Sequence, residues 1–432
     1  MKTMNIAISK EDSDYMYDVI QKVIDEAGCR MPCSPQEAKG AEIIKEELSI
    51  TCDEVDIEPF TCHPRAFLGY IKLEIIIALA SLLLFLMINI YPEWSFFLTI
   101  TCFILNVIAF FIIWEEFFNY REFIDKLFKK QESQNVVGKI KAKGEKNNII
   151  IFSGHHDSAL QFNLLRYFKA GYPIILFIGI GVLFFWIFLS GIIVVIAMVE
   201  FLLSLTIDYS FFLNLVTLLL IIVFVPLVLL FFFVTPGERA NKVPGAVDNL
   251  SAVAVVLAIG RYLKKQEAII PKNTEIQLVS FGCEEAGLRG AYRYVERHLD
   301  ELQKFNAVCV NMDGIQSTKA TQVIEYEPTT RTKHSEEVVQ KILQASELAG
   351  IEIKELGAST GAKILGQISG GTDATAFSKS GVKAANISAM ELRKFVKFYH
   401  QPSDTLDMIE RGSLDDVLKI CIAFLINESN KK

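Results

Sequence analysis

The chain has 432 residues, of which 51% are hydrophobic, and its mean hydropathy is +0.34. This apolar content exceeds that of typical soluble domains and excludes global disorder. The formal net charge is −7, and no basic stripe of the kind that binds nucleic acid is present, so we expect no nucleic-acid partner. The apolar residues are concentrated in a few blocks, which indicates membrane segments combined with a soluble domain.

The amino-terminal segment MKTMNIAISKEDSDYMYD contains no apolar run, and we expect no cleaved signal peptide. Four of the eight cysteines precede residue 65 and offer a possible zinc site. Their spacing, Cys-x3-Cys followed by Cys-x9-Cys, lacks the close pairs of structural zinc sites and disfavours this interpretation. Cys283 is expected to pack beneath the glutamates that follow it.

Four long uncharged stretches approach the ~20 residues that a helix needs to cross a bilayer. They lie between the charged residues Glu74 and Glu93, Glu93 and Glu115, Lys169 and Glu200, and Asp208 and Glu238. The pattern predicts two transmembrane hairpins that interrupt the soluble sequence. The predicted organisation is an amino-terminal part of the soluble domain at 1–72, a hairpin at 73–114, a soluble segment at 115–170, a second hairpin at 171–234 and the main soluble segment at 235–432.

Charge asymmetry predicts how these spans are oriented. Basic residues such as Arg65, Arg121, Arg166 and Lys242 flank the soluble segments, whereas the short turns inside the hairpins carry acidic residues only. The positive-inside rule therefore predicts an integral protein of the plasma membrane with its soluble domain in the cytoplasm. Because Glu74 is the only charge near a span, we expect the hairpins to act as anchors in the lipid bilayer.

The soluble segments alternate strand-like and helix-like runs. This alternation predicts an α/β fold with a mixed, largely parallel sheet flanked by helices. Strands are predicted at 135–142, 148–154, 275–282, 305–312 and 383–388, and helices at 36–48, 250–265, 290–298, 336–349 and 414–426.

Polar side chains follow several of the predicted strands. His155, His156 and Asp157 follow one strand, the pair at 284–285 follows another, and Asp313 follows a third. Ligand sites of open α/β sheets lie at the carboxyl ends of the strands, so these residues are expected to converge. Histidine, aspartate and glutamate supply donors that suit Zn²⁺.

Each residue taken alone also has a structural explanation. Asp248 could cap the helix that follows it, Asp313 could occupy a turn, and His400 could be a loop residue before a proline turn. The combination is more informative than any single residue.

Five segments in chain order resemble the motifs of metallopeptidase family 28, the di-zinc aminopeptidase-type family. They are HHDS at 155–158, GAVDNLSAVA at 245–254, CEEAGLRGAYRYV at 283–295, NMDG at 311–314 and YHQPSDTLD at 399–407. The family also contains glutaminyl cyclases and catalytically inactive, receptor-like members. The resemblance implies a zinc aminopeptidase-like fold.

The resemblance further implies two zinc ions per chain. Asp248 would bridge the two ions, His155 and Asp313 would complete one site, and Glu285 and His400 would complete the other. Paired metal ions of this kind activate water and polarise a scissile carbonyl.

By the same resemblance, Glu284 would be the general base, and Asp157 would hold and polarise the imidazole of His155. His156 would have no ligand role. The sequence departs from the family around Asp373, where Thr372 and Ala374 replace the frequent Ser-Asp-His pattern. This departure concerns the substrate pocket and affects no metal ligand.

These expectations describe a membrane-anchored zinc exopeptidase, with an aminopeptidase as the leading interpretation. The alternatives are a non-catalytic membrane scaffold or receptor with a peptidase-like fold, and a single-zinc enzyme of the glutaminyl cyclase type. The expected partners are peptides, including hydrophobic or membrane-associated ones. Nothing in the sequence indicates an oligomeric state.

Overall fold

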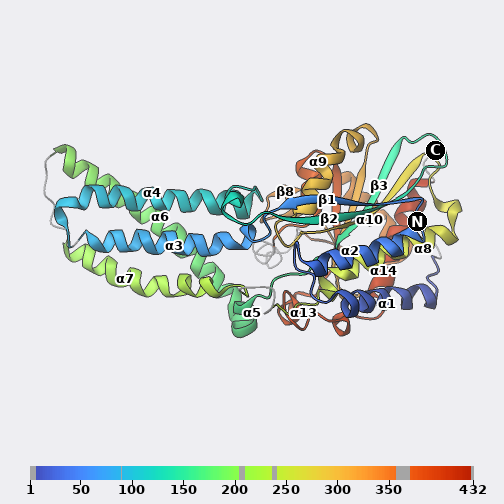
Figure 1. The fold of residues 1–432 in the computed structure, drawn as a ribbon, viewed down its shortest axis with the longest axis horizontal. Coiled ribbons are helices and arrows are strands. Elements are labelled where there is room, and N and C mark those ends of the chain that lie inside the picture. Colours follow the sequence, from blue (N-terminus) through green and yellow to red (C-terminus); the bar gives the residue numbers. More distant parts are fainter. Residues whose placement is uncertain (1–5, 89, 204–209, 236–240, 357–369, 430–432) are drawn as a thin grey trace. The chain divides into compact units, whose positions relative to one another are not determined.

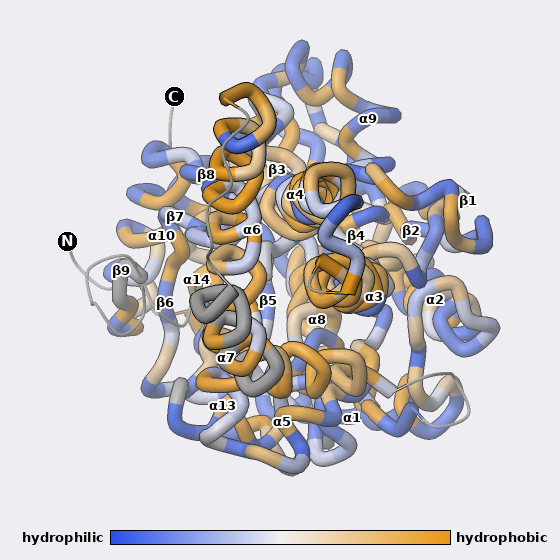
Figure 2. Tube along the Cα trace, turned by 90° about the vertical axis from the view of Figure 1, so that its left-hand side faces the viewer, coloured by the Kyte–Doolittle hydropathy of each residue, from blue (hydrophilic) through white to orange (hydrophobic). Residues whose placement is uncertain are grey.

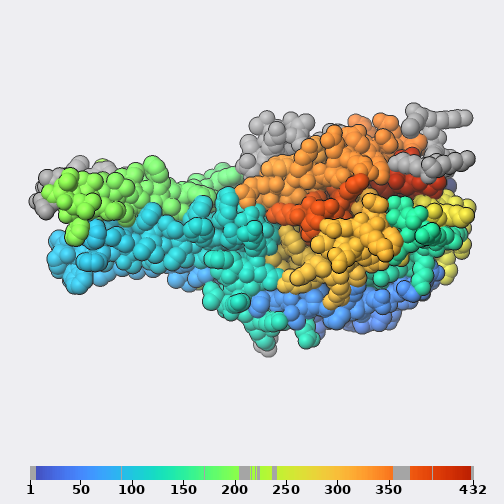
Figure 3. Space-filling model, turned by 90° about the horizontal axis from the view of Figure 1, so that it is seen from above, coloured from blue at the N-terminus to red at the C-terminus, as the bar shows by residue number. Residues whose placement is uncertain are grey.

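The computed structural model describes residues 6–88, 90–203, 210–235, 241–356 and 370–429 and divides the chain into two compact units. Unit 1 comprises Met1–Pro64, Lys129–Gln161 and Gly237–Lys432, and unit 2 comprises Arg65–Phe128 and Phe162–Pro236. In unit 1, stretches from the beginning, middle and end of the chain lie side by side, as the blue, green and yellow-to-red surfaces of Figure 3 show. The domain limits inferred from the sequence remain predictions.

Unit 1 is built around an eight-stranded sheet with the order β1-β2-β4-β3-β5-β10-β6-β9 (Figure 1). The four neighbouring strands β4, β3, β5 and β10 run parallel, whereas β1–β2, β2–β4 and β10–β6 are antiparallel pairs. The strands are β1 Glu54–Cys62, β2 Gln131–Ile140, β3 Asn148–His155, β4 Thr274–Phe281, β5 Val308–Ile315, β6 Gln322–Ile324, β9 Lys354–Leu356 and β10 Lys383–Ala389, with a separate hairpin of β7 Tyr326–Glu327 and β8 Thr332–Lys333.

Helices cover both faces of this sheet because successive residues of its central strands are apolar. In β3, Ile150 and Phe152 pack into one hydrophobic cluster with α1, α2, α8, α10 and α14, whereas Ile149 and Ile151 pack into another with α9 and α12. The helices are α1 Lys10–Ala27, α2 Pro35–Ser49, α8 Ser251–Lys265, α9 Arg289–Lys304, α10 Glu336–Ala349, α12 Ala374–Lys379, α13 Leu392–Phe398 and α14 Ser413–Ser429.

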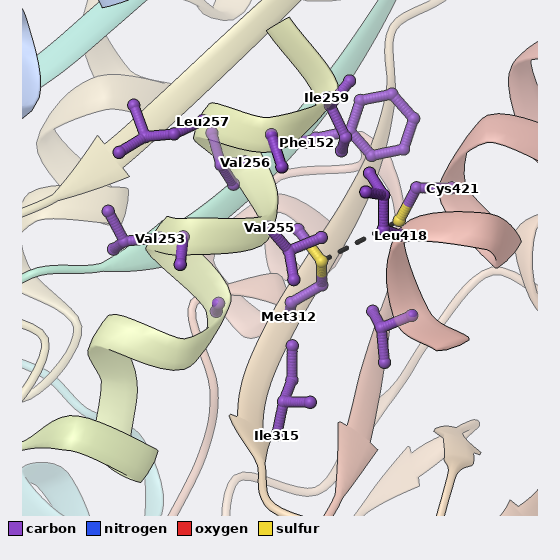
Figure 4. Packing of buried hydrophobic residues seen from close by; sticks show 14 of the residues in the cluster. Phe152, Val253, Val255, Val256, Leu257, Ile259, Met312, Ile315, Leu418 and Cys421 are labelled. Atoms are coloured by element: carbon purple, nitrogen blue, oxygen red, sulfur yellow. Dashed lines mark hydrogen bonds between the residues drawn. The ribbon is translucent and has the colours of Figure 1, made fainter. Parts of the chain in front are cut away.

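Helix α8 lies at the centre of the larger cluster. Figure 4 shows Val255 and Ile259 of α8 near Phe152 of β3 and Cys421 of α14. The thiol of Cys421 lies 3.8 Å from the sulfur of Met312 on β5. This core fixes the start of α8 against the sheet, and the turn directly before α8 carries one of the candidate site residues.

The predicted fold class is confirmed, and the predicted strands and helices of unit 1 correspond to β2, β3, β4, β5, β10, α2, α8, α9, α10 and α14. Sequence reasoning did not predict α1 or β1. Strand β1 contains Pro59, which cannot donate to a sheet, and the structure places this strand at the sheet edge, where a proline is tolerated. Strand β2 begins at Gln131, earlier than predicted, because its polar first residues pair with β1.

Unit 2 consists mainly of long apolar helices. They are α3 Ala66–Met87, α4 Ser95–Ile113, which continues into the π-helical turn η2 Trp114–Phe118, α6 Tyr172–Leu203 and α7 Ser210–Leu229, with the shorter elements η1 Pro92–Trp94, η3 Asp125–Leu127, α5 Asn163–Phe168, η4 Lys169–Gly171 and η5 Leu230–Phe232. Helix α4 contacts α3 and α6, and α6 contacts α7 (Figure 1). The predominance of apolar residues along these helices is visible in Figure 2.

Within the described residues, four helices are long and apolar enough to cross a membrane. Three of them, Ala66–Met87, Pro92–Phe118 and Tyr172–Leu203, coincide with predicted spans. The fourth, Ala246–Lys265, contains α8, whose apolar window is 89% buried, so its hydropathy reflects a core position. The fourth predicted span contains α7, and its charged limits, Asp208 and Glu238, lie outside the described residues.

Polar side chains join three of the helices in unit 2. The indole nitrogen of Trp186 on α6 donates to the Ser81 hydroxyl on α3, and this hydroxyl donates to the backbone carbonyl of Cys102 on α4. The side-chain amide of Asn106 on α4 donates to the Ser190 hydroxyl on α6 at 2.9 Å. These hydrogen bonds join α3, α4 and α6 through buried polar groups.

Candidate metal centre

The carboxyl ends of the parallel strands bring the predicted polar residues to one edge of the sheet. His155 is the last residue of β3, and Asp313 lies near the end of β5. Glu284 and Glu285 follow the end of β4, which is the parallel neighbour of β3. Since β4, β3 and β5 are adjacent and parallel, their ends coincide in space.

Asp248 lies in the middle of this arrangement. It precedes α8 in η7 Ala246–Leu250, whose backbone is non-helical at Asp248 and Asn249. One carboxylate oxygen of Asp248 is 3.2 Å from Nε2 of His155, and the other is 3.3 Å from Nε2 of His400. A single carboxylate therefore separates two imidazoles.

Each imidazole has further acidic neighbours. Nε2 of His155 lies 3.9 Å from Oδ1 of Asp313 and 3.7 Å from Oε2 of Glu284. Nε2 of His400 lies 3.3 Å from Oε1 of Glu285. The donor atoms of His155, Glu284 and Asp313 lie within 4.8 Å of one another. The same holds for those of His155, Asp248 and Glu285. Both groups consist of residue types that can hold a metal ion. All six residues predicted as ligands or base are thus brought together.

Asp157, also predicted from the sequence, connects two parts of the centre. Its Oδ1 lies 3.3 Å from Nδ1 of His155, the nitrogen that faces away from Asp248. The same carboxylate accepts backbone N–H groups from Glu284 at 3.1 Å and from Glu285 at 3.0 Å. Asp157 therefore orients both an imidazole and the glutamate loop.

Two further residues support the centre and were missed by sequence reasoning. The buried carboxylate of Asp404 accepts the backbone N–H of Val247 at 2.7 Å and that of Asp248 at 3.2 Å. The side-chain amide of Asn249 donates to the carbonyl of Met312 and accepts from the N–H of Gly314, so that it brackets Asp313. Both residues lie inside motifs that the sequence singled out, but no residue pattern reveals what their side chains contact.

The burial of so many carboxyl groups changes their acidity. Burial, together with neighbouring carboxylates, raises the pKa of both Glu284 and Glu285 well above the usual value. Burial and the charge of Asp248 raise the pKa of Asp313 to about 7. Burial acts on Asp248 in the same direction, but its contacts with His155 and His400 outweigh burial and lower its pKa.

Acidic groups surround His155 and raise its pKa. Burial opposes its protonation, but Glu284, Asp157 and Asp248 outweigh burial and raise its pKa well above the usual value. His155 is only 1% exposed, and neither of its ring nitrogens has a well-formed hydrogen bond in the described part of the chain. Oriented donors with surplus negative charge in a buried position fit a cation such as Zn²⁺.

His156 and Asp373, which the sequence analysis also considered, take no part in the histidine–carboxylate contacts. The ring of His156 is buried, its Nδ1 lies 2.9 Å from the Ser280 hydroxyl, and burial lowers its pKa to about 4. Asp373 is fully buried, and neither of its carboxylate oxygens has a hydrogen-bond partner among the described residues. Burial raises its pKa well above the usual value, and His155 acts in the opposite direction.

Comparisons with solved structures agree with this architecture. A zinc aminopeptidase from Bacillus subtilis, BSAP, matches with a TM-score of 0.53 and 15% identity over 97% of this chain and 95% of that one. The glutaminyl cyclase of Fimbriiglobus ruber matches with a TM-score of 0.53 and 11% identity over 99% of this chain and 97% of that one. At these identities the likeness concerns the fold alone.

Comparisons of sequence are more specific. Aminopeptidase YwaD of Bacillus subtilis (strain 168) is 30% identical over 174 residues, which cover 40% of this chain and 35% of that protein. Residues 234–425 match the family model described as Peptidase family M28. This segment contains all the predicted ligands except His155. His155 lies at the same edge of the sheet, at the end of β3. Residues 234–425 of this chain are therefore similar to peptidase family M28.

Proposed function

We propose that this protein is a membrane-anchored, zinc-dependent exopeptidase, and specifically an aminopeptidase that uses two zinc ions. The position of Asp248 between the imidazoles of His155 and His400 carries this proposal. Each imidazole has an additional carboxylate nearby, from Asp313 on one side and from Glu285 on the other. The result is two three-donor sites that share one carboxylate, as a pair of adjacent metal ions requires.

This arrangement supports the roles that the family resemblance implies. His155, Asp248 and Asp313 would hold one ion, and Asp248, Glu285 and His400 would hold the other. When bound, two zinc ions would supply Lewis acidity that polarises the scissile carbonyl and makes water a better acid.

Glu284 would move the proton. Its carboxylate lies within 4.8 Å of donor atoms of His155 and Asp313 and is not part of the group formed by His155, Asp248 and Glu285. Its pKa is raised mainly by burial. A carboxylate in this position can take a proton from attacking water and return it to the leaving amine. Asp157 would keep Glu284 in place through the backbone N–H that it accepts, and would keep His155 in the tautomer that ligates through Nε2.

The membrane location and the substrates are part of the same proposal. Three apolar helices of unit 2 reach span length, and we propose that unit 2 anchors the enzyme in the plasma membrane with unit 1 in the cytoplasm. The second hairpin interrupts the sequence between Asp157 and Asp248. We infer that it also helps hydrophobic or membrane-associated peptides reach the site.

Metal content is the first test. Elemental mass spectrometry of the detergent-purified chain should find about two zinc ions per chain, because the donor set divides into two groups that share Asp248. About one ion would favour the single-zinc cyclase-type alternative. A folded chain that takes up essentially no zinc at these residues would favour the non-catalytic scaffold.

Replacement of Glu284 by glutamine should separate binding from turnover. Glu284→Gln should retain zinc but hydrolyse aminoacyl substrates about 10²–10⁴-fold more slowly, because an amide cannot accept the proton from water. Glu296→Gln, an exposed position on α9, is the matched control and should leave the rate unchanged. Undiminished hydrolysis by Glu284→Gln would exclude Glu284 as the base.

Asp404 should set metal affinity without contacting the metal. Asp404→Ala leaves the backbone N–H groups of Val247 and Asp248 without their acceptor, and we expect zinc affinity to fall about 10–100-fold in competition with a chromogenic chelator. Asp404→Asn keeps one acceptor oxygen and should have an intermediate affinity. Asp407→Ala, at an exposed residue of the same segment, should bind zinc normally. Equal affinities for Asp404→Ala and Asp407→Ala would contradict this role of Asp404.

Substrate preference should reveal whether the second hairpin does more than anchor the enzyme. In a variant with residues 171–234 replaced by a short linker, cleavage of long hydrophobic peptides should fall far more than cleavage of soluble dipeptides. The dipeptide rate of the same preparation serves as the control for folding and metal loading. An equal loss for both substrates would show that the hairpin contributes only anchoring.

A further inference from the structure

Three cysteines that are distant in sequence meet next to the glutamate loop. Cys33 follows α1, Cys62 is the last residue of β1, and Cys283 directly precedes Glu284. The Sγ atom of Cys33 lies 3.4 Å from that of Cys62 and 3.4 Å from that of Cys283, and the remaining edge of this sulfur triangle is 3.7 Å. We refer to Cys33, Cys62 and Cys283 as the thiol triad.

The triad forms a compact group that is separate from the histidine–carboxylate centre. Its three sulfur atoms satisfy the geometry expected of a group of metal ligands. Cys62 and Cys283 are buried, whereas Cys33 is half-buried and gives the triad a connection to solvent. None of the chain's eight cysteines, all of which are described, forms a disulfide bond.

The backbone holds two members of the triad in an unusual conformation. Cys33 and Cys283 have φ values of 59° and 52°, in the left-handed region that residues with a side chain seldom adopt. The buried carboxylate of Glu37 accepts both of their backbone N–H groups, at 2.7 Å and 2.9 Å, and also the hydroxyl of Ser133. Glu37 therefore fixes the two backbones and leaves their sulfur atoms to face each other.

We propose that the thiol triad is a second metal site that binds a thiophilic d¹⁰ ion, namely Zn²⁺. Zinc holds thiolates at about 2.3 Å, so two sulfurs of one tetrahedron lie about 3.8 Å apart. The triad needs to open by only a few tenths of an ångström to reach this separation. A disulfide would instead require one pair of sulfurs to approach to about 2.05 Å.

Binding would exchange protons for metal. Each thiol would lose its proton to solvent as its sulfur ligates the ion, and solvent at the half-buried Cys33 side would provide the fourth ligand. The ion would join the loop after α1, the end of β1 and the loop that carries Glu284 and Glu285. Its role would be to fasten these three segments, and the proposal does not depend on peptidase activity.

Cadmium provides a direct probe because Cd²⁺ bound to thiolates absorbs in the ultraviolet, whereas histidine–carboxylate sites give no sulfur-to-metal band. Titration of the reduced, chelator-treated full-length protein in detergent with Cd²⁺ should produce this band, and its final absorbance should correspond to one thiolate-bound ion per chain. In Cys33→Ser the band should fall by at least about one third, because one of three thiolate ligands is lost. The half-buried Cys52, which lies outside the triad, provides the control Cys52→Ser, which should retain the full band.

Alkylation of the wild-type protein tests the same proposal without any substitution. Bound Cd²⁺ should slow iodoacetamide labelling of the triad, with Cys33 showing the clearest change, and should leave Cys52 unaffected. Absence of a sulfur-to-metal band, or an unchanged band in folded Cys33→Ser, would overturn the proposal. A native disulfide within the triad, detected by mass spectrometry in protein purified without reductant, would also overturn it.

Discussion

The site depends on a concentration of carboxyl groups inside the protein, at the carboxyl edge of a parallel sheet. Asp248, Glu284, Glu285 and Asp313 all lie there with little solvent access. Buried negative charges repel one another and lose hydration, and the raised pKa values of three of them express this cost. A cation would offset this repulsion, so the concentration of carboxyl groups favours metal binding.

Neighbouring polar groups determine how the donors are presented. Asp157 joins an imidazole to the backbone of the glutamate loop, Asn249 spans the peptide groups around Asp313, and Asp404 holds the peptide of Asp248. These contacts connect segments that are far apart in the chain. Each of these donor segments is therefore held by a side chain from another position in the chain. Such contacts limit how far the site can relax when a single one is lost.

The connections between elements accommodate the apolar insertions without disturbing the sheet. Strands β1 and β2 pair from Glu54↔Lys139 to Cys62↔Gln131 although the first stretch of unit 2 separates them in sequence. The second insertion begins after the motif that follows β3 and ends before α8. Insertions at such connections leave the pairing and the buried faces of the core unchanged, which is why one soluble fold can be assembled from three stretches of chain.

The sequence by itself predicted the fold class and the long apolar helices and, through the resemblance of its motifs to a known family, the residues that meet in the histidine–carboxylate centre. These features depend on local signals: uncharged runs such as 171–199, buried strands such as 148–155, and polar motifs at strand ends. Hydropathy averaged over a window does not distinguish a membrane span from a buried core helix. Helix α8 is apolar enough to span a membrane but lies in the core of unit 1.

Only the tertiary structure decided which distant side chains meet. The cysteine spacings before residue 65 did not reveal the thiol triad, because its third member, Cys283, comes from a different part of the chain. The supporting contacts of Asp404 and Asn249 were equally hidden, since they involve backbone groups of other segments. Spacing along a sequence reports only local geometry, whereas these contacts arise from strand order and from the packing of loops at one end of the sheet.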